Sequence, residues 1–352
     1  MRILFIPVSS KKGIGEYMRS SILADACLKE WPDADIRFVL SKEAPYHQDC
    51  SYQTLITDRS PTFHIKEVND YISSFNPDIV IFDASGRASQ IRHAKKCGAT
   101  TVFIAQHNKK INKGMRLSRL RHIDLFWIAQ PDFTVQPLRW IDKLKLKILK
   151  KPLPVYLGCI YTPPNDQEEQ DVLNKYKLES GNYIFISAGS GGHFTSDRKL
   201  AADIFHQAIE LSGLDIPSIQ VWGANYPGKD IPESNDNKLN IKKIPNSEFV
   251  CLLKNSKMAF INGGDTILQA FSLNIPSLAI PVSGDQPARI EAALRRNTCC
   301  IYAPAEVRKI IEGLINLSKP ETQAELRINM MDLNVLNGYS KSVESLKVIC
   351  NT

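Results

Sequence analysis

Short apolar runs alternate with helical patterns along the chain, and this alternation restricts the possible folds more than any other feature. In the first half, the expected strands are Ile3–Val8, Asp35–Leu40, Ile79–Asp83 and Thr101–Ala105, with a further apolar run at His122–Ala129. Helical patterns lie between them at Tyr17–Trp31 and Ile65–Phe75. Continuous apolar runs are typical of parallel strands buried on both faces. The first half therefore predicts a doubly wound α/β domain.

The second half repeats this rhythm after a proline-rich stretch. Its expected strands are Tyr183–Ala188, Ser218–Gly223, Asn240–Ile244, Met258–Ile261 and Ser277–Pro281, and its expected helices are Asp197–Ser212, Ser247–Lys254 and Ala288–Arg296. The segment Lys151–Pro164 contains four prolines, which break helices and favour a linker. A chain of 352 residues is too long for one ordinary core. We predict a first domain at 1–151, a linker at 152–164, a second domain at 165–338 and a final helix at 339–352.

Composition limits the compartment and the partners. The net charge of +7 favours an anionic partner, which leaves a nucleotide diphosphate, an acidic membrane and a nucleic acid open. Eight cysteines without a CxxC pair predict reduced thiols in a cytoplasmic protein. The opening residues MRILFIPV predict a first strand and not a signal peptide, and no apolar stretch is long enough to span a membrane.

The segment Met258–Leu294 carries the main functional signal. A predicted strand ends at Asn262, the paired glycines Gly263 and Gly264 follow, and Thr266 opens a helix. Paired glycines let the backbone approach a ligand, and a helix N-terminus offers free N–H groups, so this pattern suits a diphosphate. A second interpretation needs no ligand, because Thr266 and Gln269 have the spacing of a capping box.

The whole segment resembles the donor-binding signature of nucleotide-sugar glycosyltransferases of the B fold (GT-B). The nearest likenesses are the lipid-linked N-acetylglucosaminyltransferase of peptidoglycan synthesis and the UDP-glycosyltransferases. The resemblance implies two Rossmann-like domains that face each other across a cleft, with the donor on the second domain, the acceptor on the first and the final helix packed back on the first domain. No essential metal and no cofactor are implied, because the nucleotide-sugar is itself a substrate.

The resemblance also implies roles for individual residues. The donor-side residues are Ile244, Asn262, Gly263, Gly264, Asp265, Thr266, Gln269, Asp285 and Gln286. Among them the paired glycines and Thr266 line the diphosphate, Gln269 binds the ribose, and the Asp-Gln pair faces the sugar. This chain departs from the pattern, because Asn262 replaces a common His, Gln269 replaces a Glu, and Arg289 stands where Asn is usual. An amide still hydrogen-bonds a ribose hydroxyl, although without charge assistance.

Two glycine-rich loops extend the expected site. The loop Gly189–His193 comprises Gly189, Ser190, Gly191, Gly192 and His193, follows a predicted strand, and precedes a helix with a cap expected near Ser196 or Asp197. It resembles the loop that faces the donor diphosphate in the same enzymes. Because a strand-to-helix turn also needs glycine for geometry alone, a structural role stays open.

The segment Lys11–Arg19, KKGIGEYMR, resembles a loop of the UDP-sugar hydrolase of pseudaminic acid synthesis. The resemblance places Gly13, Gly15 and Arg19 on the acceptor side, and it puts Glu16 where the hydrolase has its catalytic His. Glu16 is therefore a candidate general base, or else an acidic residue that favours a helix N-terminus.

Asp83 and His107 are the other catalytic candidates, because each follows a predicted strand and ligands bind beyond the carboxyl ends of parallel strands. Asp83 has an alternative role as the N-cap of the next helix. No His, Cys and Asp cluster has the spacing of metal ligands, so no metal site is expected.

The segment Leu138–Leu153, LRWIDKLKLKILKKPL, interleaves five lysines with apolar residues. Residues 138–151 can lie on an anionic membrane surface, or they can form an ordinary solvated helix. No aromatic platform or helix-turn-helix accompanies them, so nucleic acid is not an expected partner.

The sequence therefore predicts a transferase that moves a sugar from a nucleotide diphosphate, most simply UDP, to a hydroxyl acceptor of the cell envelope. Two alternatives stay open. One is a nucleotide-sugar hydrolase or epimerase on the same fold. The other is a nucleotide-sugar-binding partner that lost its chemistry through the changes at Asn262 and Gln269.

Overall fold

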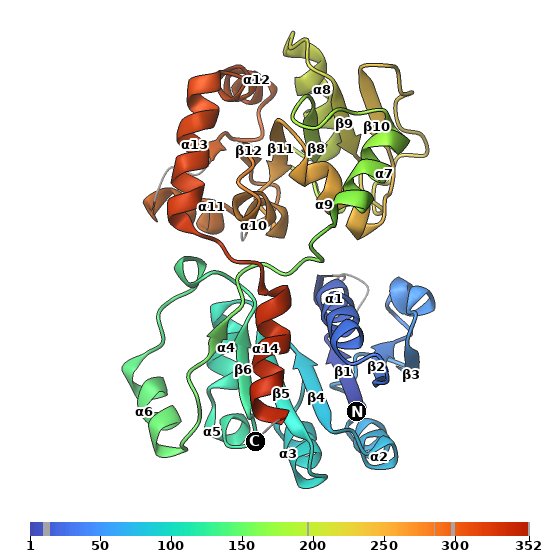
Figure 1. The fold of residues 1–352 in the computed structure, drawn as a ribbon, viewed down its shortest axis with the longest axis vertical. Helices are drawn as coiled ribbons and strands as arrows, with labels where there is room; N and C mark the ends of the chain where they lie inside the picture. Colours follow the sequence, from blue (N-terminus) through green and yellow to red (C-terminus); the bar gives the residue numbers. More distant parts are fainter. Residues whose placement is uncertain (10–14, 196, 285, 297–299, 351–352) are drawn as a thin grey trace. The chain divides into compact units, whose positions relative to one another are not determined.

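The chain forms two α/β units, each built on its own parallel sheet (Figure 1). The computed structural model describes residues 1–9, 15–195, 197–284, 286–296 and 300–350. Unit 1 comprises Met1–Tyr161 together with Asn337–Thr352, and unit 2 comprises Thr162–Leu336. Unit 1 is therefore discontinuous in sequence, while unit 2 is one uninterrupted segment.

The unit 1 sheet has the strand order β3-β2-β1-β4-β5-β6-β7 over the described residues, and every neighbouring pair is parallel. Its strands are β1 (Arg2–Pro7), β2 (Asp35–Ser41), β3 (Gln53–Thr57), β4 (Ile79–Asp83), β5 (Thr100–Ala105), β6 (Leu125–Ile128) and β7 (Val155–Tyr156). Its helices are α1 (Gly15–Glu30), α2 (Ile65–Phe75), α3 (Ala88–Lys96), α4 (Asn108–Gly114), α5 (Leu117–Leu120), α6 (Trp140–Ile148) and α14 (Gly338–Cys350), with 3₁₀ turns at Pro45–Asp49 and Asp132–Thr134.

Both faces of the unit 1 sheet are buried, which explains why its strands read as continuous apolar runs. Alternate residues of β1 point to opposite faces, so that Leu4 and Ile6 join one core cluster while Ile3 and Phe5 join the other. The first cluster includes residues of α2 to α6, and the second includes residues of α1 and α14. The two layers of helices enclose the sheet (Figure 1).

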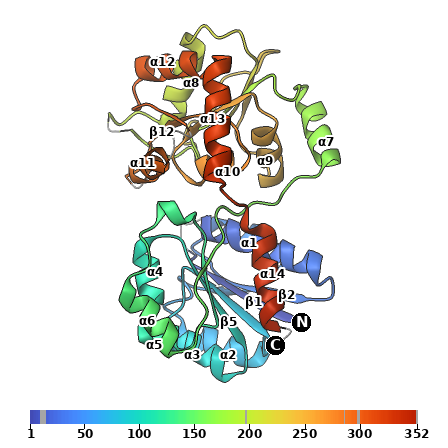
Figure 2. The ribbon, with the colours of Figure 1, turned by 60° about the vertical axis from the view of Figure 1, so that its left-hand side comes forward.

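Helix α14 belongs to unit 1 although it follows unit 2 in the sequence. It packs along α1 (Figure 2), and its Leu346 is buried in the core on that face. The Trp127 indole N–H donates to Ser345 Oγ at 3.0 Å. The chain returns to unit 1 beside the point where it left, since Asn337 Nδ2 donates to the carbonyl of Tyr161 at 2.8 Å.

The unit 2 sheet has the order β10-β9-β8-β11-β12-β13, again parallel throughout the described strands. Its strands are β8 (Ile184–Ser187), β9 (Ser218–Val221), β10 (Lys238–Ile241), β11 (Met258–Asn262), β12 (Ser277–Ile280) and β13 (Ile301–Tyr302). Its helices are α7 (Asp166–Tyr176), α8 (Ala201–Leu211), α9 (Asn246–Lys254), α10 (Asp265–Ser272), α11 (Gln286–Arg296), α12 (Val307–Leu317) and α13 (Pro320–Leu333).

The two sheets share one topology. Counted within each unit, the order of the first six strands is 3-2-1-4-5-6, so the strand order reverses between β1 and β4 in unit 1 and between β8 and β11 in unit 2. This is the Rossmann arrangement, and ligands of such sheets bind at the reversal, beyond the carboxyl ends of the strands. The predicted fold class is confirmed.

The structure corrects two predicted helix starts. Helix α8 begins at Ala201 after an N-cap at Leu200, so Asp197 does not cap it, and Ser196 lies outside the described residues. Helix α10 begins at Asp265 with Gly264 as its N-cap, and this residue makes no side-chain capping bond. The capping box of Thr266 and Gln269 is therefore not formed, because the N-cap position is a glycine that has no side chain to offer.

Candidate functional site

The loops that follow β8 and β11 are joined at the strand reversal of unit 2. Asn262, the last residue of β11, is 4% exposed and donates through Nδ2 to the carbonyl of Ala188 at 3.2 Å. Its Oδ1 accepts the backbone N–H of Gly264 at 3.3 Å. One buried amide side chain therefore positions both glycine loops that the sequence assigned to the donor.

Two of these glycines cannot carry a side chain. Gly189 has a φ of +86°, and a Cβ there would overlap the Asn262 side-chain amide. Gly191 has a φ of +87°, and a Cβ there would overlap the carbonyl of Trp222. Both positions favour glycine through the left-handed backbone and through close packing. The loop after β8 is thus held against its neighbours with its backbone in a fixed path.

The N-terminus of α10 lies directly after the paired glycines, at the strand reversal of unit 2. Its N-cap residue, Gly264, has no side chain and so makes no side-chain capping bond to the first turn. Thr266 is half-buried in the first turn, while Gln269 is half-buried one turn later and Asp265 is exposed. Uncapped N–H groups and the positive end of the helix dipole attract a diphosphate.

The loop after β12 is fastened to the same site. The backbone N–H of Val282 donates to Gln286 Oε1 at 2.8 Å, and Gln286 is 4% exposed. Arg289, from α11, donates to the carbonyl of Gly263 at 3.0 Å and lies 3.6 Å from the Asp265 carboxylate. Gln286 therefore holds its own loop, and Arg289 holds the paired glycines. Asp285 lies outside the described residues.

The remaining donor-side residues lie on the same edge of the sheet. The carbonyl of Ser190 accepts the N–H of Asn225 at 2.8 Å, while Gly192 is exposed and His193 is half-buried. Ile244 is half-buried between β10 and α9. All of them follow the carboxyl ends of parallel strands. The described donor-side residues predicted from the sequence therefore lie at one edge of the unit 2 sheet.

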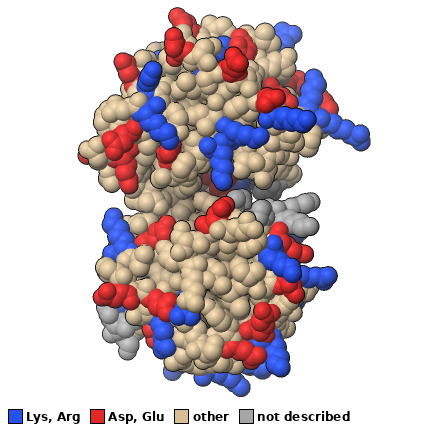
Figure 3. Space-filling model, turned by 90° about the vertical axis from the view of Figure 1, so that its right-hand side faces the viewer, with Lys and Arg blue, Asp and Glu red and all other residues tan. Residues whose placement is uncertain are grey.

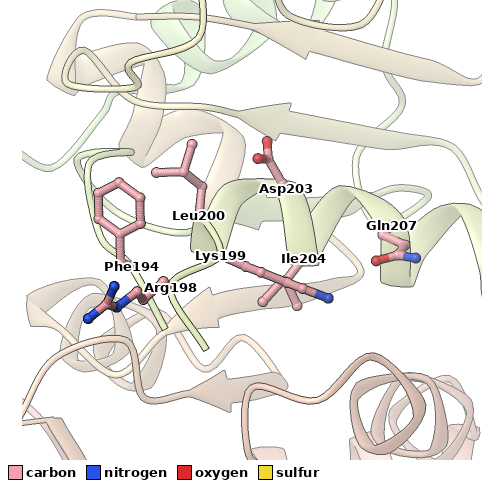
Figure 4. A pocket seen from close by; sticks show the side chains of 7 residues that line it. All are labelled: Phe194, Arg198, Lys199, Leu200, Asp203, Ile204 and Gln207. Atoms are coloured by element: carbon pink, nitrogen blue, oxygen red, sulfur yellow. The ribbon is translucent and has the colours of Figure 1, made fainter. Parts of the chain in front are cut away.

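Two hollows flank Phe194, which follows the loop after β8. A pocket of about 420 Å³ is lined by residues of the loop after β12 and by Phe194, Tyr302 and Pro304. A second pocket, of about 300 Å³, lies at the start of α8, with Phe194, Leu200 and Asp203 among its lining residues (Figure 4). The first pocket adjoins Val282, whose N–H binds Gln286, and so it offers an apolar wall beside the candidate donor site.

The equivalent position in unit 1 is occupied by a buried ion pair. Asp83, the last residue of β4, is 0% exposed and accepts from Arg19 Nη2 at 2.6 Å and from Arg19 Nε at 2.9 Å. Ser20 Oγ also donates to it, at 3.2 Å. Burial raises the pKa of the Asp83 carboxyl, and the Arg19 guanidinium opposes this rise. Asp83 does not cap α3, because the N-cap of that helix is Arg87.

Glu16 and His107 are the catalytic candidates with exposed surface. Glu16 is half-buried in the first turn of α1, close enough for its charge to raise the pKa of Asp83. His107 is exposed at the N-cap of α4, directly beyond β5. Gly15 opens α1, and Gly13 lies outside the described residues. Arg19, the other described acceptor-side residue, donates to the carboxylate of Asp83, which is itself a catalytic candidate.

Sequence reasoning did not anticipate the bridging contacts of Asn262, the pairing of Arg19 with Asp83, or the role of Arg289 in holding Gly263. Among the described residues, no group of three or more His, Cys, Asp or Glu side chains is placed to hold a metal ion. No described helix combines the length and the apolar character that crossing a membrane requires.

Two Rossmann-type units, with the glycine loops at the strand reversal of the second, define the class of fold as GT-B. No protein-family model matches the chain, and no curated protein matches it. Solved structures do match along its whole length.

The spinosyn forosaminyltransferase SpnP is similar, with a TM-score of 0.67, 12% identity and 99% of each chain covered. Phytolacca americana UGT2, solved with UDP-2fluoro-glucose and pterostilbene, has a TM-score of 0.65 at 12% identity, with 100% of both chains covered. A putative UDP-N-acetylglucosamine 2-epimerase from Listeria monocytogenes has a TM-score of 0.56 at 11% identity, covering 96% of this chain and 92% of that one. At these identities the likeness shows the fold.

Proposed function

We propose that the protein is a glycosyltransferase that moves a hexosyl or N-acetylhexosaminyl group from a UDP-sugar to a hydroxyl acceptor of the cell envelope. The observation that carries the proposal is the N-terminus of α10, which has a glycine as its N-cap and is tied through Asn262 to the glycine loop after β8. Backbone N–H groups of this kind suit a leaving diphosphate. The similar structures include UGT2 with a UDP-sugar analogue and VinC with dTDP.

The proposed reaction needs one base and one stabilised leaving group. Glu16 or His107 takes the proton of the acceptor hydroxyl as the acceptor oxygen bonds to the anomeric carbon. The bond from that carbon to the diphosphate oxygen breaks, and its electron pair leaves with the diphosphate toward the N–H groups of α10. The nucleotide-sugar is consumed as a substrate, and no cofactor takes part.

The first test is nucleotide binding followed by turnover. UDP should raise the melting temperature, because a ligand at one hundred times its Kd adds about 2.7 kcal/mol. Transfer that requires an added acceptor supports the proposal. Release of UDP or a change in the sugar without acceptor would instead show a hydrolase or an epimerase, and UDP binding without any turnover would show a non-catalytic partner.

A substitution at Gly264 tests the diphosphate site directly. A Cβ on Gly264 would lie 3.2 Å from Asn262 Oδ1, so the branched side chain of Gly264→Val should displace the bridging amide and obstruct the diphosphate. We expect UDP binding to be lost in a protein that stays folded by circular dichroism. Gly15→Val is the control, since Gly15 belongs to unit 1 and a Cβ there meets nothing within 4 Å. Unchanged UDP affinity in folded Gly264→Val would contradict the site.

We further propose that α6 holds the protein on an anionic membrane. The outward face of this helix exposes Trp140 (76%), Ile148 (70%) and Leu144 (44%), while Asp142 and Leu146 are buried. An ordinary solvated helix turns its apolar stripe toward the core, whereas α6 exposes apolar residues to solvent.

Four of the five lysines of this segment divide into two groups. Lys145 pairs with Asp142 at 2.8 Å and Lys151 pairs with Asp124 at 3.1 Å. Lys143 and Lys147 are exposed beside the apolar stripe and form no ion pair with a described residue. Each lysine near an anionic surface contributes about 1 kcal/mol.

Sedimentation with anionic liposomes at low salt tests this surface. Lys143→Glu/Lys147→Glu should reduce binding strongly, whereas Lys66→Glu/Lys96→Glu, the same charge change on exposed lysines of other helices, should not. UDP binding should be equal in both variants. Wild-type protein that stays in the supernatant would leave α6 as a solvated helix.

A further inference from the structure

Five basic side chains on one face of the unit 1 sheet lie close enough together to repel one another. This basic cluster consists of Arg87, Lys110, Lys113, Arg116 and Arg119. Burial lowers the pKa of Lys113, and the positive charges of the other four members lower it further. The pKa of Arg119 is lowered in the same way, by burial and then by Arg116 and Arg87. The cluster therefore concentrates positive charge at a partly buried place.

No member of the basic cluster forms an ion pair with a residue that the structure describes. Other basic residues of unit 1 do: Lys95 and Lys151 both reach Asp124, at 2.7 Å and 3.1 Å. Basic and acidic side chains are interspersed on the face drawn in Figure 3. Unpaired like charges held together are unfavourable unless an anion joins them.

Arg119 shows where such an anion would bind. Its side chain is 8% exposed, and its Nε is buried and has no hydrogen-bond partner among the described residues. A buried donor without an acceptor is costly in a native protein, and such a group calls for an explanation. Arginine also presents a planar set of donors that matches phosphate oxygens.

The cluster reaches the edge of the sheet at which ligands bind. Lys110 Nζ donates to the carbonyl of Ala84 at 2.6 Å, and Arg87 Nε donates to the carbonyl of Thr62 at 3.0 Å. Ala84 directly follows Asp83, the last residue of β4, and Lys110 lies in the first turn of α4 after β5. The cluster thus extends from the carboxyl ends of β4 and β5, where an open sheet binds its ligand.

We propose that the basic cluster binds a phosphate or diphosphate group of the acceptor, an inference that rests on the proposed transferase function. The donor diphosphate has its own proposed site at the glycine loops of unit 2, so the cluster serves a second anion. A phosphorylated sugar or a phosphate-linked lipid provides that anion together with a free hydroxyl.

Inorganic pyrophosphate, titrated by calorimetry with UDP already saturating, is the probe. Wild-type protein should bind it, and Lys113→Ala/Arg116→Ala should weaken binding at least about tenfold, the loss of about 1.4 kcal/mol expected for charge-assisted contacts. Lys109→Ala is the matched control, because Lys109 is an exposed lysine of the same helix that lies outside the basic cluster. Its pyrophosphate affinity should match that of the wild type. Arg116→Glu should abolish binding yet raise the melting temperature without ligand, since it relieves the repulsion.

Equal pyrophosphate affinity in the wild type and the double variant would overturn the proposal, whether or not UDP binds. Loss of UDP binding with pyrophosphate binding intact would overturn the proposed function alone. A short RNA that displaces pyrophosphate and binds far more tightly would also overturn the acceptor assignment. Sedimentation with phosphatidic acid vesicles that depends on Arg116 would identify a lipid-borne phosphate. Pyrophosphate binding without such sedimentation would identify a soluble phosphorylated acceptor.

Discussion

The two sheets reverse strand order at equivalent places, yet the two reversals are held together by different chemistry. In unit 2, the last residue of β11 is Asn262, a neutral amide that bonds two backbone groups. In unit 1, the last residue of β4 is Asp83, a buried carboxylate held by Arg19. A neutral bridge leaves the helix dipole and N–H groups available for a charged ligand. In unit 1, Asp83 and Arg19 bond to each other, so residues at the rim of this ion pair, such as Glu16, would contact a ligand.

The largest expected effect tests whether Glu16, at the rim of the ion pair, takes part in the reaction. Glu16→Gln keeps the shape of the side chain but removes a base, so the transfer rate should fall by about 10² to 10⁴. UDP affinity should stay the same, because the proposed donor site is in unit 2. Steady-state kinetics and calorimetry measure both. Glu43→Gln, an exposed glutamate of unit 1, serves as the control. An unchanged rate would transfer the role of base to His107.

The next effect concerns stability. Asp83→Ala leaves the Arg19 guanidinium buried without its counter-charge, which should cost about 3–5 kcal/mol in the free energy of unfolding. Urea denaturation measures this loss. The surface pair Arg37–Asp35, at 2.8 Å, offers the comparison, and Asp35→Ala should cost about 0–1 kcal/mol. A similar small cost at both sites would show that the buried pair does not hold the reversal in unit 1.

The smallest effect tests the neutral bridge. Asn262→Ala removes two hydrogen bonds, each worth about 1 kcal/mol, and frees both glycine loops. UDP affinity should fall about tenfold, which corresponds to about 1.4 kcal/mol. Asn240→Ala removes the acceptor of the Trp222 indole in the same unit and should lower stability without changing UDP affinity. If both variants bind UDP equally well, Asn262 does not organise the donor loops.

The sequence predicted the strands best where both faces of the sheet are covered. Ile79–Asp83 is matched residue for residue, because five successive buried positions leave a continuous apolar run. Strands β7 and β13, of two residues each, went unpredicted, since a pair of residues has no periodicity. The glycine motifs located the candidate donor loops because glycine is required locally, by φ and by close packing.

The contacts that organise the candidate sites were less accessible to sequence reasoning. Arg19 and Asp83 are 64 residues apart, and Ala188 and Asn262 are 74 apart, so no local pattern indicates either contact. The capping box was a false signal, since its spacing is common and the backbone began the helix at Asp265. The basic cluster joins the N-cap of α3 to α4 and α5, and only the fold shows that their charges converge.

The return of α14 to unit 1 has a consequence for the order of biosynthesis. Ribosomes complete residues 162–336 before they make the helix whose Leu346 enters the core beside α1. The segment that is made first thus acquires its last core helix only after the whole of unit 2 has emerged. Domains usually fold from the N-terminus onward during synthesis. Here unit 2 can complete its folding before unit 1. Until α14 is made, one face of the unit 1 sheet stays incompletely covered.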